Sequence, residues 1–215
     1  MSRTARSFRA ALAGVILLSA TSPCRAALTS SATVPNATYA SVIRSVNPRV
    51  REEQSRIYAE ALLANARRMH VDPRLVMAVV TVESHWNARA VSSSGARGLG
   101  QFLPGTARDL GVDTRSARST LRGVSTYLHQ LLSLFRSSRY AMREAIAGYN
   151  AGPFAVRRHG IPRYGQTPRY VAKVLSTFRF LQARLSPKPE VREVVAELDA
   201  AKIFKTQGDA YWGVR

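Results

Sequence analysis

An apolar run that ends in a carboxylic acid constrains this chain more than any other feature. Residues 75–82, LVMAVVTV, are apolar at all but one position, and Glu83 follows them directly. Asp72 and Pro73, just before the run, form a favourable helix start, with Asp as the N-cap and Pro in the first helical position. The Ser- and Gly-rich stretch that follows breaks the apolar pattern. The sequence therefore predicts a buried helix from Pro73 to about Ser84, with Glu83 in its last turn.

The expected surroundings of Glu83 favour a protonated side chain. Apolar neighbours disfavour the charged form of a carboxylic acid and raise its pKa, and the negative end of the helix dipole acts in the same direction. Helical spacing places Val79 and Val80 on the same face, so this face is not polar. A raised pKa is what a general acid needs near neutral pH. An exposed position on an amphipathic helix, or a perturbed acid in a structural role, is the alternative interpretation.

The first 26 residues are typical of a secretory signal. Arg3, Arg6 and Arg9 precede the apolar residues 10–20, and a small-x-small site predicts cleavage before Ala27. The apolar stretch is too short to span a bilayer comfortably. We expect an exported protein, periplasmic or associated with the cell wall. Contact with a membrane would be peripheral at most, or made through an uncleaved N-terminal segment.

The charge of the chain indicates an anionic partner. The formal net charge is +19, and cleavage would leave +15 because four arginines leave with the segment, together with the only cysteine. Cell-wall polymers and anionic lipids suit such a balance. No helix-turn-helix, zinc or RNP-type pattern accompanies it, so we expect no nucleic-acid partner. A solvated Arg-rich surface without a specific partner is the plainer explanation of much of the excess.

The 215 residues suit one domain with appendages. Residues 27–50 are rich in Ser, Thr, Ala and Asn and are interpreted as a flexible linker or lead-in. Helical spacing of apolar residues recurs from 51 to 186, where it predicts a mainly α catalytic domain. Residues 187–215, after a proline-marked boundary, predict a short helical C-terminal extension.

Few acidic residues are available for catalysis. Glycosidases ordinarily pair two carboxylates, one to donate a proton and one to activate water or attack the sugar. No second acid is evident near Glu83, which suggests that the substrate supplies the second group. The histidines are scattered and the one cysteine lies in the predicted signal, so we expect neither a metal nor a cofactor. Between residues 55 and 185 the acids are Glu60, Asp72, Glu83, Asp109, Asp113 and Glu144.

Three ordered motifs resemble the soluble-type (SLT) lytic transglycosylases of the lysozyme-like superfamily. The resemblance covers residues 52–185 and implies a mainly α, lysozyme-like fold. It is carried by Glu83-Ser84, Ser92, Gly95-Ala96, Gly98-Leu99, Gln101, Pro104 and Thr106-Ala107, by Gly148-Tyr149-Asn150-Ala151-Gly152, and by Ile161-Pro162 with Tyr170-Val171.

The resemblance implies cleavage of the MurNAc–GlcNAc β-1,4 bond of peptidoglycan glycan strands. Glu83 would act as general acid and then as general base, and the muramyl C6 hydroxyl would attack C1 to give a 1,6-anhydro end. Ser92, Gln101 and Asn150 would hydrogen-bond the sugar and its acetamido group. Tyr149 and Tyr170 would line the cleft, and Tyr170 would also orient the Glu83 carboxyl group.

The chain departs from the family pattern at two glycines. Gly100 stands where Met is usual, which predicts an altered wall of the sugar cleft, and Gly148 stands where Ala is usual. A lysozyme-like hydrolase on the same fold, and an inactive basic protein that binds the cell wall, remain alternatives. A basic membrane- or nucleic-acid-binding protein would leave the order of the motifs unexplained. The compact size makes a secretion system or another envelope-spanning apparatus a candidate partner.

Overall fold

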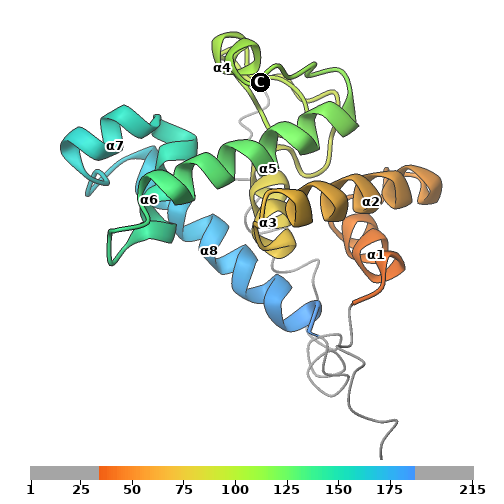
Figure 1. Cartoon of the computed structure of the whole chain (residues 1–215). Helices are drawn as coiled ribbons and strands as arrows, with labels where there is room; N and C mark the ends of the chain where they lie inside the picture. The colour runs from red at the N-terminus through yellow and green to blue at the C-terminus, as the bar shows by residue number, and fades with distance from the viewer. Residues whose placement is uncertain (1–33, 187–215) are drawn as a thin grey trace, which may run out of the picture. The chain divides into compact units, whose positions relative to one another are not determined.

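The structure is a computed structural model that describes residues 34–186. The predicted signal peptide and the predicted C-terminal extension lie outside the described residues. Within the described part the prediction of a mainly helical chain is confirmed, because its only β features are the isolated bridges that Arg97 makes with Val91 and Phe102. The helices, shown in Figure 1, are α1 (Asn36–Val46), α2 (Glu52–Arg68), α3 (Pro73–Ser84), α4 (Pro104–Asp109), α5 (Ala117–Leu134), α6 (Ala141–Ala151), α7 (Pro153–His159) and α8 (Gln166–Arg184).

Helix α3 is the central helix of the described residues. Every residue from Leu75 to Val82 is buried, because α2, α5 and α8 pack around it (Figure 1). Its start is as predicted: Asp72 caps the helix by accepting a hydrogen bond from the backbone N–H of Arg74, and Pro73 takes the first position. A helix that is apolar all round is stable only when it is enclosed in this way. The end of α3 is therefore held by the core itself.

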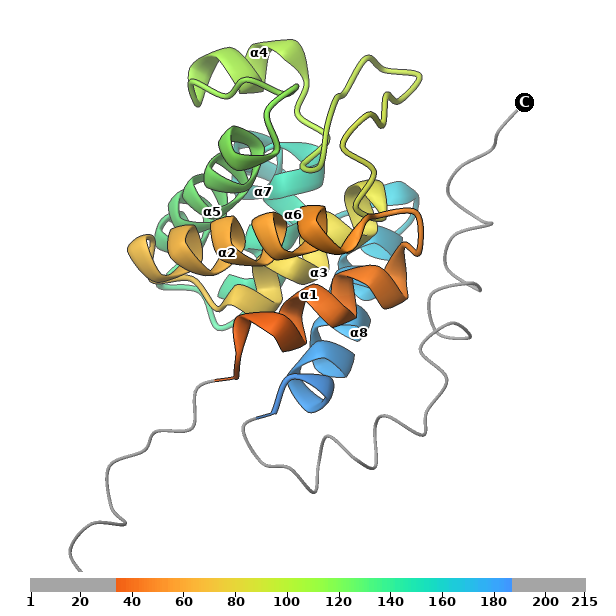
Figure 2. The ribbon, with the colours of Figure 1, turned by 90° about the vertical axis from the view of Figure 1, so that its right-hand side faces the viewer.

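The interpretation of residues 27–50 as a linker is wrong for the part that the structure describes. Residues 36–46 form α1, which packs against α2 (Figure 2). Its buried face includes Tyr39, Val42 and Ile43, and all three belong to the main hydrophobic core. The polar residues between them, which suggested a linker, lie on the solvent side. The compact unit therefore begins before the expected boundary at residue 51.

Helix α8 begins one residue before Thr167. A Thr before a Pro favours an N-cap at the Thr, whereas the helix begins at Gln166 after Gly165, whose φ is +95°. Only glycine adopts such a backbone conformation readily. Thr167 is thereby placed inside the first turn, where its hydroxyl donates to Asn150 Oδ1 at 3.0 Å instead of capping the helix.

The connection from α3 to α4 turns sharply at its beginning. His85 and Trp86 both have left-handed backbone conformations, with φ of +48° and +61°. The loop after them crosses above the end of α3 in Figure 2. In the described part of the chain no helix is long and apolar enough to cross a membrane.

Candidate active site

Glu83 lies in the last turn of α3 and is half-buried. Burial raises the pKa of its carboxyl group from 4.5 to about 8, because water no longer stabilises the charge. The hydroxyl of Tyr170 donates a hydrogen bond of 2.6 Å to Glu83 Oε1 and lowers this pKa, but less than burial raises it. Glu83 is therefore predominantly protonated at neutral pH.

The residues after Glu83 are fixed from two sides. The Asn47 side chain, which follows α1, donates to the His85 carbonyl oxygen at 2.9 Å. The indole N–H of Trp86 donates to Thr81 Oγ1 at 3.0 Å, and its ring stacks on Tyr58 of α2 with centroids 5.9 Å apart. Left-handed conformations in non-glycine residues cost on the order of 1–3 kcal/mol each. These contacts stabilise the strained turn and so hold the end of α3.

Tyr149 connects α6 to the loop that carries Gln101. Its hydroxyl donates to the Gly100 carbonyl oxygen at 2.9 Å. Burial raises the pKa of Tyr149 well above its ordinary value, and the nearby negative charge of Glu83 raises it further. Because the charge of Glu83 acts on Tyr149, the α6 motif lies close enough to Glu83 for the two residues to interact electrostatically.

The structure gives a physical reason for glycine at position 100. A Cβ atom there would lie 2.6 Å from Val124 Cγ2, 2.8 Å from Phe102 Cε2 and 3.1 Å from the Tyr149 hydroxyl oxygen. Side chains from α5, α6 and the loop therefore occupy the space that a Met side chain at this position would need. The expected change in one wall of the site is thus accompanied by an aromatic cluster of Phe102, Tyr127 and Tyr149.

Gln101 has a strained backbone, and one of its side-chain atoms lacks a hydrogen-bond partner among the described residues. Its φ is +48°, and its side-chain amide donates to the carbonyl oxygens of Ala90 at 3.1 Å and Gly98 at 2.9 Å. Its Oε1 is buried and has no hydrogen-bond partner among the described residues. Leaving a buried acceptor unpaired costs about 1–3 kcal/mol, so such an atom needs an explanation, and a ligand is one.

Ser92 and Asn150 both have structural partners and spare donors. Ser92 Oγ accepts from the Ala96 backbone N–H at 3.0 Å, which closes the loop and leaves the hydroxyl hydrogen for another acceptor. Asn150 Oδ1 accepts from Thr167, which leaves its amide N–H groups for another acceptor. Asn150 is thereby tied to the first turn of α8, one turn before Tyr170.

Hydrogen bonds join the sequence-predicted residues into two connected networks. One runs from Glu83 through Tyr170 to α8 and Asn150, and the other from Tyr149 through Gly100 to Gln101. Ser92 is joined only through its own loop. Sequence reasoning missed Tyr127 and Thr167: Tyr127 could have been found from its helical spacing after Val124, but nothing local indicates the bond from Thr167 to Asn150.

Among residues 34–186, no second carboxylate contributes to the pKa of Glu83. Burial raises this pKa and the hydrogen bond from Tyr170 lowers it, and no other acid among the described residues contributes. Within residues 34–186, no three His, Cys, Asp or Glu side chains are grouped so that they could hold a metal ion. The chemistry available from these residues is one protonated acid among hydrogen-bonding groups.

The sequence pattern of the Transglycosylase SLT domain matches residues 60–170, more than half of the chain. This chain belongs to that family. The matched range begins in α2 and ends at Tyr170, and it contains all the predicted site residues. The family assignment thus confirms the resemblance carried by the three motifs, while the roles of the individual residues stay predictions.

Two curated relatives share parts of this range. The chain is 36% identical over 85 residues to a membrane-bound lytic murein transglycosylase F of Photobacterium profundum, and 43% identical over 63 residues to one of Yersinia enterocolitica. These matches cover 38% and 29% of this chain but only 16% and 13% of the relatives. An X-ray structure of an inactive mutant of lytic transglycosylase Slt from Pseudomonas aeruginosa is 24% identical, with a TM-score of 0.42 over 81% of this chain and 30% of that one.

Replacing Tyr170 with Phe is expected to raise the pKa of Glu83 further. The hydrogen bond from Tyr170 stabilises the ionised carboxylate, so its loss leaves burial unopposed. The measurement is a titration of the carboxyl carbons by NMR in protein labelled at glutamate. Tyr140→Phe, on an exposed ring, is the control. An unchanged or lowered Glu83 pKa in Tyr170→Phe would contradict the assignment.

Replacing Glu83 with Gln is expected to stabilise the fold increasingly as the pH rises. The pKa of this acid is higher in the folded protein, so its stabilising contribution is complete below pH 4.5 and is lost as the pH rises through about 8. Between pH 5 and pH 9 the free energy of unfolding of Glu83→Gln should therefore gain on the order of 2–4 kcal/mol relative to the wild type.

Urea denaturation at both pH values measures this difference, and the solvent-exposed Glu60→Gln makes the same chemical change away from the site. A relative stability of Glu83→Gln that stays constant, or falls, between the two pH values would rule out the raised pKa.

Proposed function

We propose that this chain is a peptidoglycan lytic transglycosylase that cleaves the MurNAc–GlcNAc β-1,4 bond and leaves a 1,6-anhydro-muramyl end. The observation that carries the proposal is Glu83, whose pKa burial raises to about 8, whose carboxyl group Tyr170 holds, and on which no second carboxylate among the described residues acts. Membership of the SLT transglycosylase family supports it. The names of the two relatives, both lytic murein transglycosylases, agree with it.

In the first step Glu83 gives its proton to the glycosidic oxygen. The bond between that oxygen and C1 of MurNAc breaks, the GlcNAc 4-hydroxyl leaves, and positive charge develops at C1. The N-acetyl group of the same MurNAc stabilises this centre. A pKa near 8 keeps Glu83 loaded with the proton at neutral pH, and the release of that proton creates the carboxylate that the second step needs.

In the second step the ionised Glu83 takes the proton of the muramyl C6 hydroxyl, and O6 forms the new bond to C1. Glu83 is protonated again and no water is consumed. The donor from Tyr170 is well placed for the intermediate state, because it stabilises the carboxylate form. This cycle uses one carboxylic acid twice and needs no second one, in contrast to paired-carboxylate hydrolysis.

The remaining predicted residues supply complementary groups for the sugar. Gln101 Oε1 is an acceptor with no protein partner among the described residues and suits the N–H of an acetamido group. Ser92 and Asn150 retain hydrogen-bond donors for sugar oxygens. Tyr149 acts mainly through Gly100, whose carbonyl it holds, and so fixes the backbone before Gln101.

The cellular setting belongs to the same proposal. The signal-like first 26 residues predict export, which would place the enzyme in the periplasm or at the cell wall, where its glycan substrate lies. Both relatives are described as membrane-bound. Local opening of peptidoglycan for an envelope-spanning apparatus is a role that fits this setting.

Purified protein is expected to release muropeptides with 1,6-anhydro ends from purified sacculi. Mass spectrometry distinguishes these products, because an anhydro end weighs one water less than the reducing end left by hydrolysis. Glu83→Gln should lower the rate at least about 100-fold, the usual contribution of a general acid.

Glu60→Gln, on the exposed side of α2, is the matched control and should retain activity. Reducing muramic ends as the main product would assign the chain to the lysozyme-like hydrolases instead. Equal rates for Glu83→Gln and the wild type would exclude Glu83 as the acid.

A further inference from the structure

A cavity begins where α3 ends, directly after Glu83. It has a volume of about 1150 Å³, and sixteen residues line it. One wall is the connection from α1 to α2, residues 46–51, and the opposite wall is the loop 84–91 that follows Glu83. Ligand pockets commonly measure about 300–1,000 Å³, so this cavity has room for several linked residues of a ligand. Neither Glu83 nor the other predicted site residues line it.

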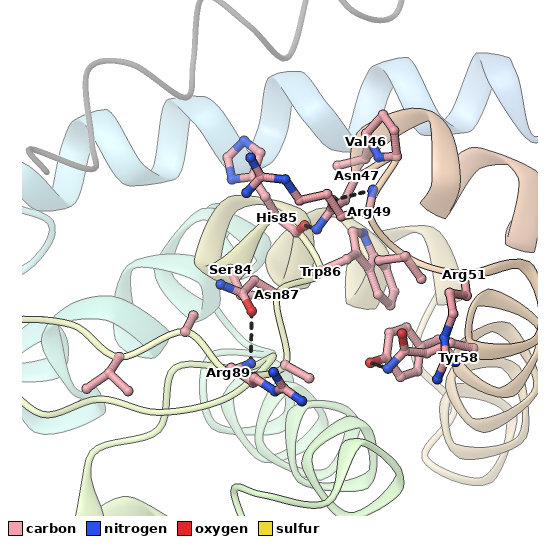
Figure 3. A pocket seen from close by; sticks show the side chains of 16 residues that line it. Val46, Asn47, Arg49, Arg51, Tyr58, Ser84, His85, Trp86, Asn87 and Arg89 are labelled. Atoms are coloured by element: carbon pink, nitrogen blue, oxygen red, sulfur yellow. Dashed lines mark hydrogen bonds between the residues drawn. The ribbon is translucent and has the colours of Figure 1, made fainter.

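The cavity is basic and carries no compensating acid. Arg49, Arg51 and Arg89 line it, and none of its lining residues is Asp or Glu. In Figure 3 Arg51 and Arg89 lie on opposite sides of the open space, and Arg49 lies above it. Within residues 34–186 none of these three side chains forms an ion pair, although Glu52 next to Arg51 pairs with Arg44 and Arg56. The three guanidinium groups are therefore free to bind an anionic ligand.

The walls that present these arginines are well ordered by their own contacts. Asn47 Oδ1 accepts from the Arg49 backbone N–H at 3.0 Å, and Asn87 Oδ1 accepts from the Arg89 backbone N–H at 2.9 Å. The Asn47 side chain also joins the two walls through the His85 carbonyl oxygen. The backbone positions of Arg49 and Arg89 are thus fixed at the two walls. Guanidinium groups bind carboxylates in a bidentate geometry.

We propose that this cavity binds the carboxylate-bearing stem peptide of peptidoglycan. The inference rests on the proposed function, since it assigns a second part of the same substrate. The stem peptide leaves the lactyl group of MurNAc and carries several free carboxylates. Four extended residues span about 14 Å, which exceeds the 10–12 Å diameter of a helix. A peptide on a MurNAc placed at Glu83 is therefore long enough to extend past the end of α3 to the cavity, whose lining begins at Ser84.

The cavity fits a peptide better than a membrane surface. It is concave, and apolar groups from Val46, Pro48 and Val91 line it beside the arginines. Val91 is 53% exposed, so an apolar contact is available at the wall that leads to Ser92. Alternating carboxylates and short apolar side chains match this lining, whereas a flat lipid surface does not enter a cavity.

The test measures binding of the free peptidoglycan tetrapeptide to the full chain by calorimetry, with the fully amidated tetrapeptide as the uncharged comparison. The wild type should bind the free form at least about tenfold more tightly, because charge-assisted hydrogen bonds are lost on amidation. The triple variant Arg49→Gln, Arg51→Gln and Arg89→Gln should lose this preference.

A matched triple variant, Arg67→Gln, Arg68→Gln and Arg143→Gln, removes the same charge from exposed positions outside the cavity and should keep the preference. If the cavity variant does not fold, Arg89→Gln alone should reduce the preference. Equal preference in the wild type and the cavity variant would overturn the proposal. So would selective loss of binding to phosphatidylglycerol vesicles with tetrapeptide binding unchanged, because that result assigns the cavity to a membrane.

This assay involves no glycosidic bond, so its outcome is independent of catalysis. Tetrapeptide binding without 1,6-anhydro products would support the peptide site in the cavity and contradict only the proposed function. Formation of 1,6-anhydro products without tetrapeptide binding would support the proposed function and contradict the peptide site.

Discussion

The site depends on the loss of water around one carboxyl group. Glu83 ends a helix whose preceding residues are enclosed by α2, α5 and α8, and this burial outweighs the hydrogen bond from Tyr170 in setting its pKa. Both effects are useful to the proposed cycle. Burial keeps the proton on the acid before the reaction, and Tyr170 stabilises the carboxylate after the proton has left. A carboxyl group with only one of these environments would suit only one of the two steps.

The strained backbone around Glu83 is stabilised by contacts far apart in sequence. The left-handed residues His85 and Trp86 end α3, and Gln101 in the same loop is left-handed as well. Asn47 and Tyr149 hold the two ends of this loop through the carbonyl oxygens of His85 and Gly100. Strained conformations persist when surrounding structure fixes them, and they cluster at functional sites. The loop is thereby held at one end by the residue that follows α1 and at the other end by α6.

The sequence predicted the features that depend on local pattern. The bounds of α3, its cap and the position of Glu83 follow from the apolar run and the Asp-Pro pair, and the structure has them in place. Helix α1 was missed because the many Ser, Thr, Ala and Asn residues of the range 27–50 suggested a linker, although Tyr39, Val42 and Ile43 have helical spacing. Thr167 was misplaced because its partner, Asn150, lies on another helix.

The basic cavity could not be predicted either, because its two walls come from separate segments of the chain. The cavity suggests a specific use for part of the high positive charge of the chain. Three of the arginines line a cavity at the end of α3, where the proposed peptide site would use them to select a substrate. In the proposed enzyme, recognition of the peptide and cleavage of the glycan would share the end of α3.

The most direct test of this account is a titration of Glu83 in the wild-type protein, followed by the NMR shift of its carboxyl carbon and assigned by its absence in Glu83→Gln. The account predicts a midpoint near pH 8, about where burial places it. A midpoint near that of an ordinary glutamic acid would show a hydrated, ionised carboxylate, and the proposed proton donor would not exist.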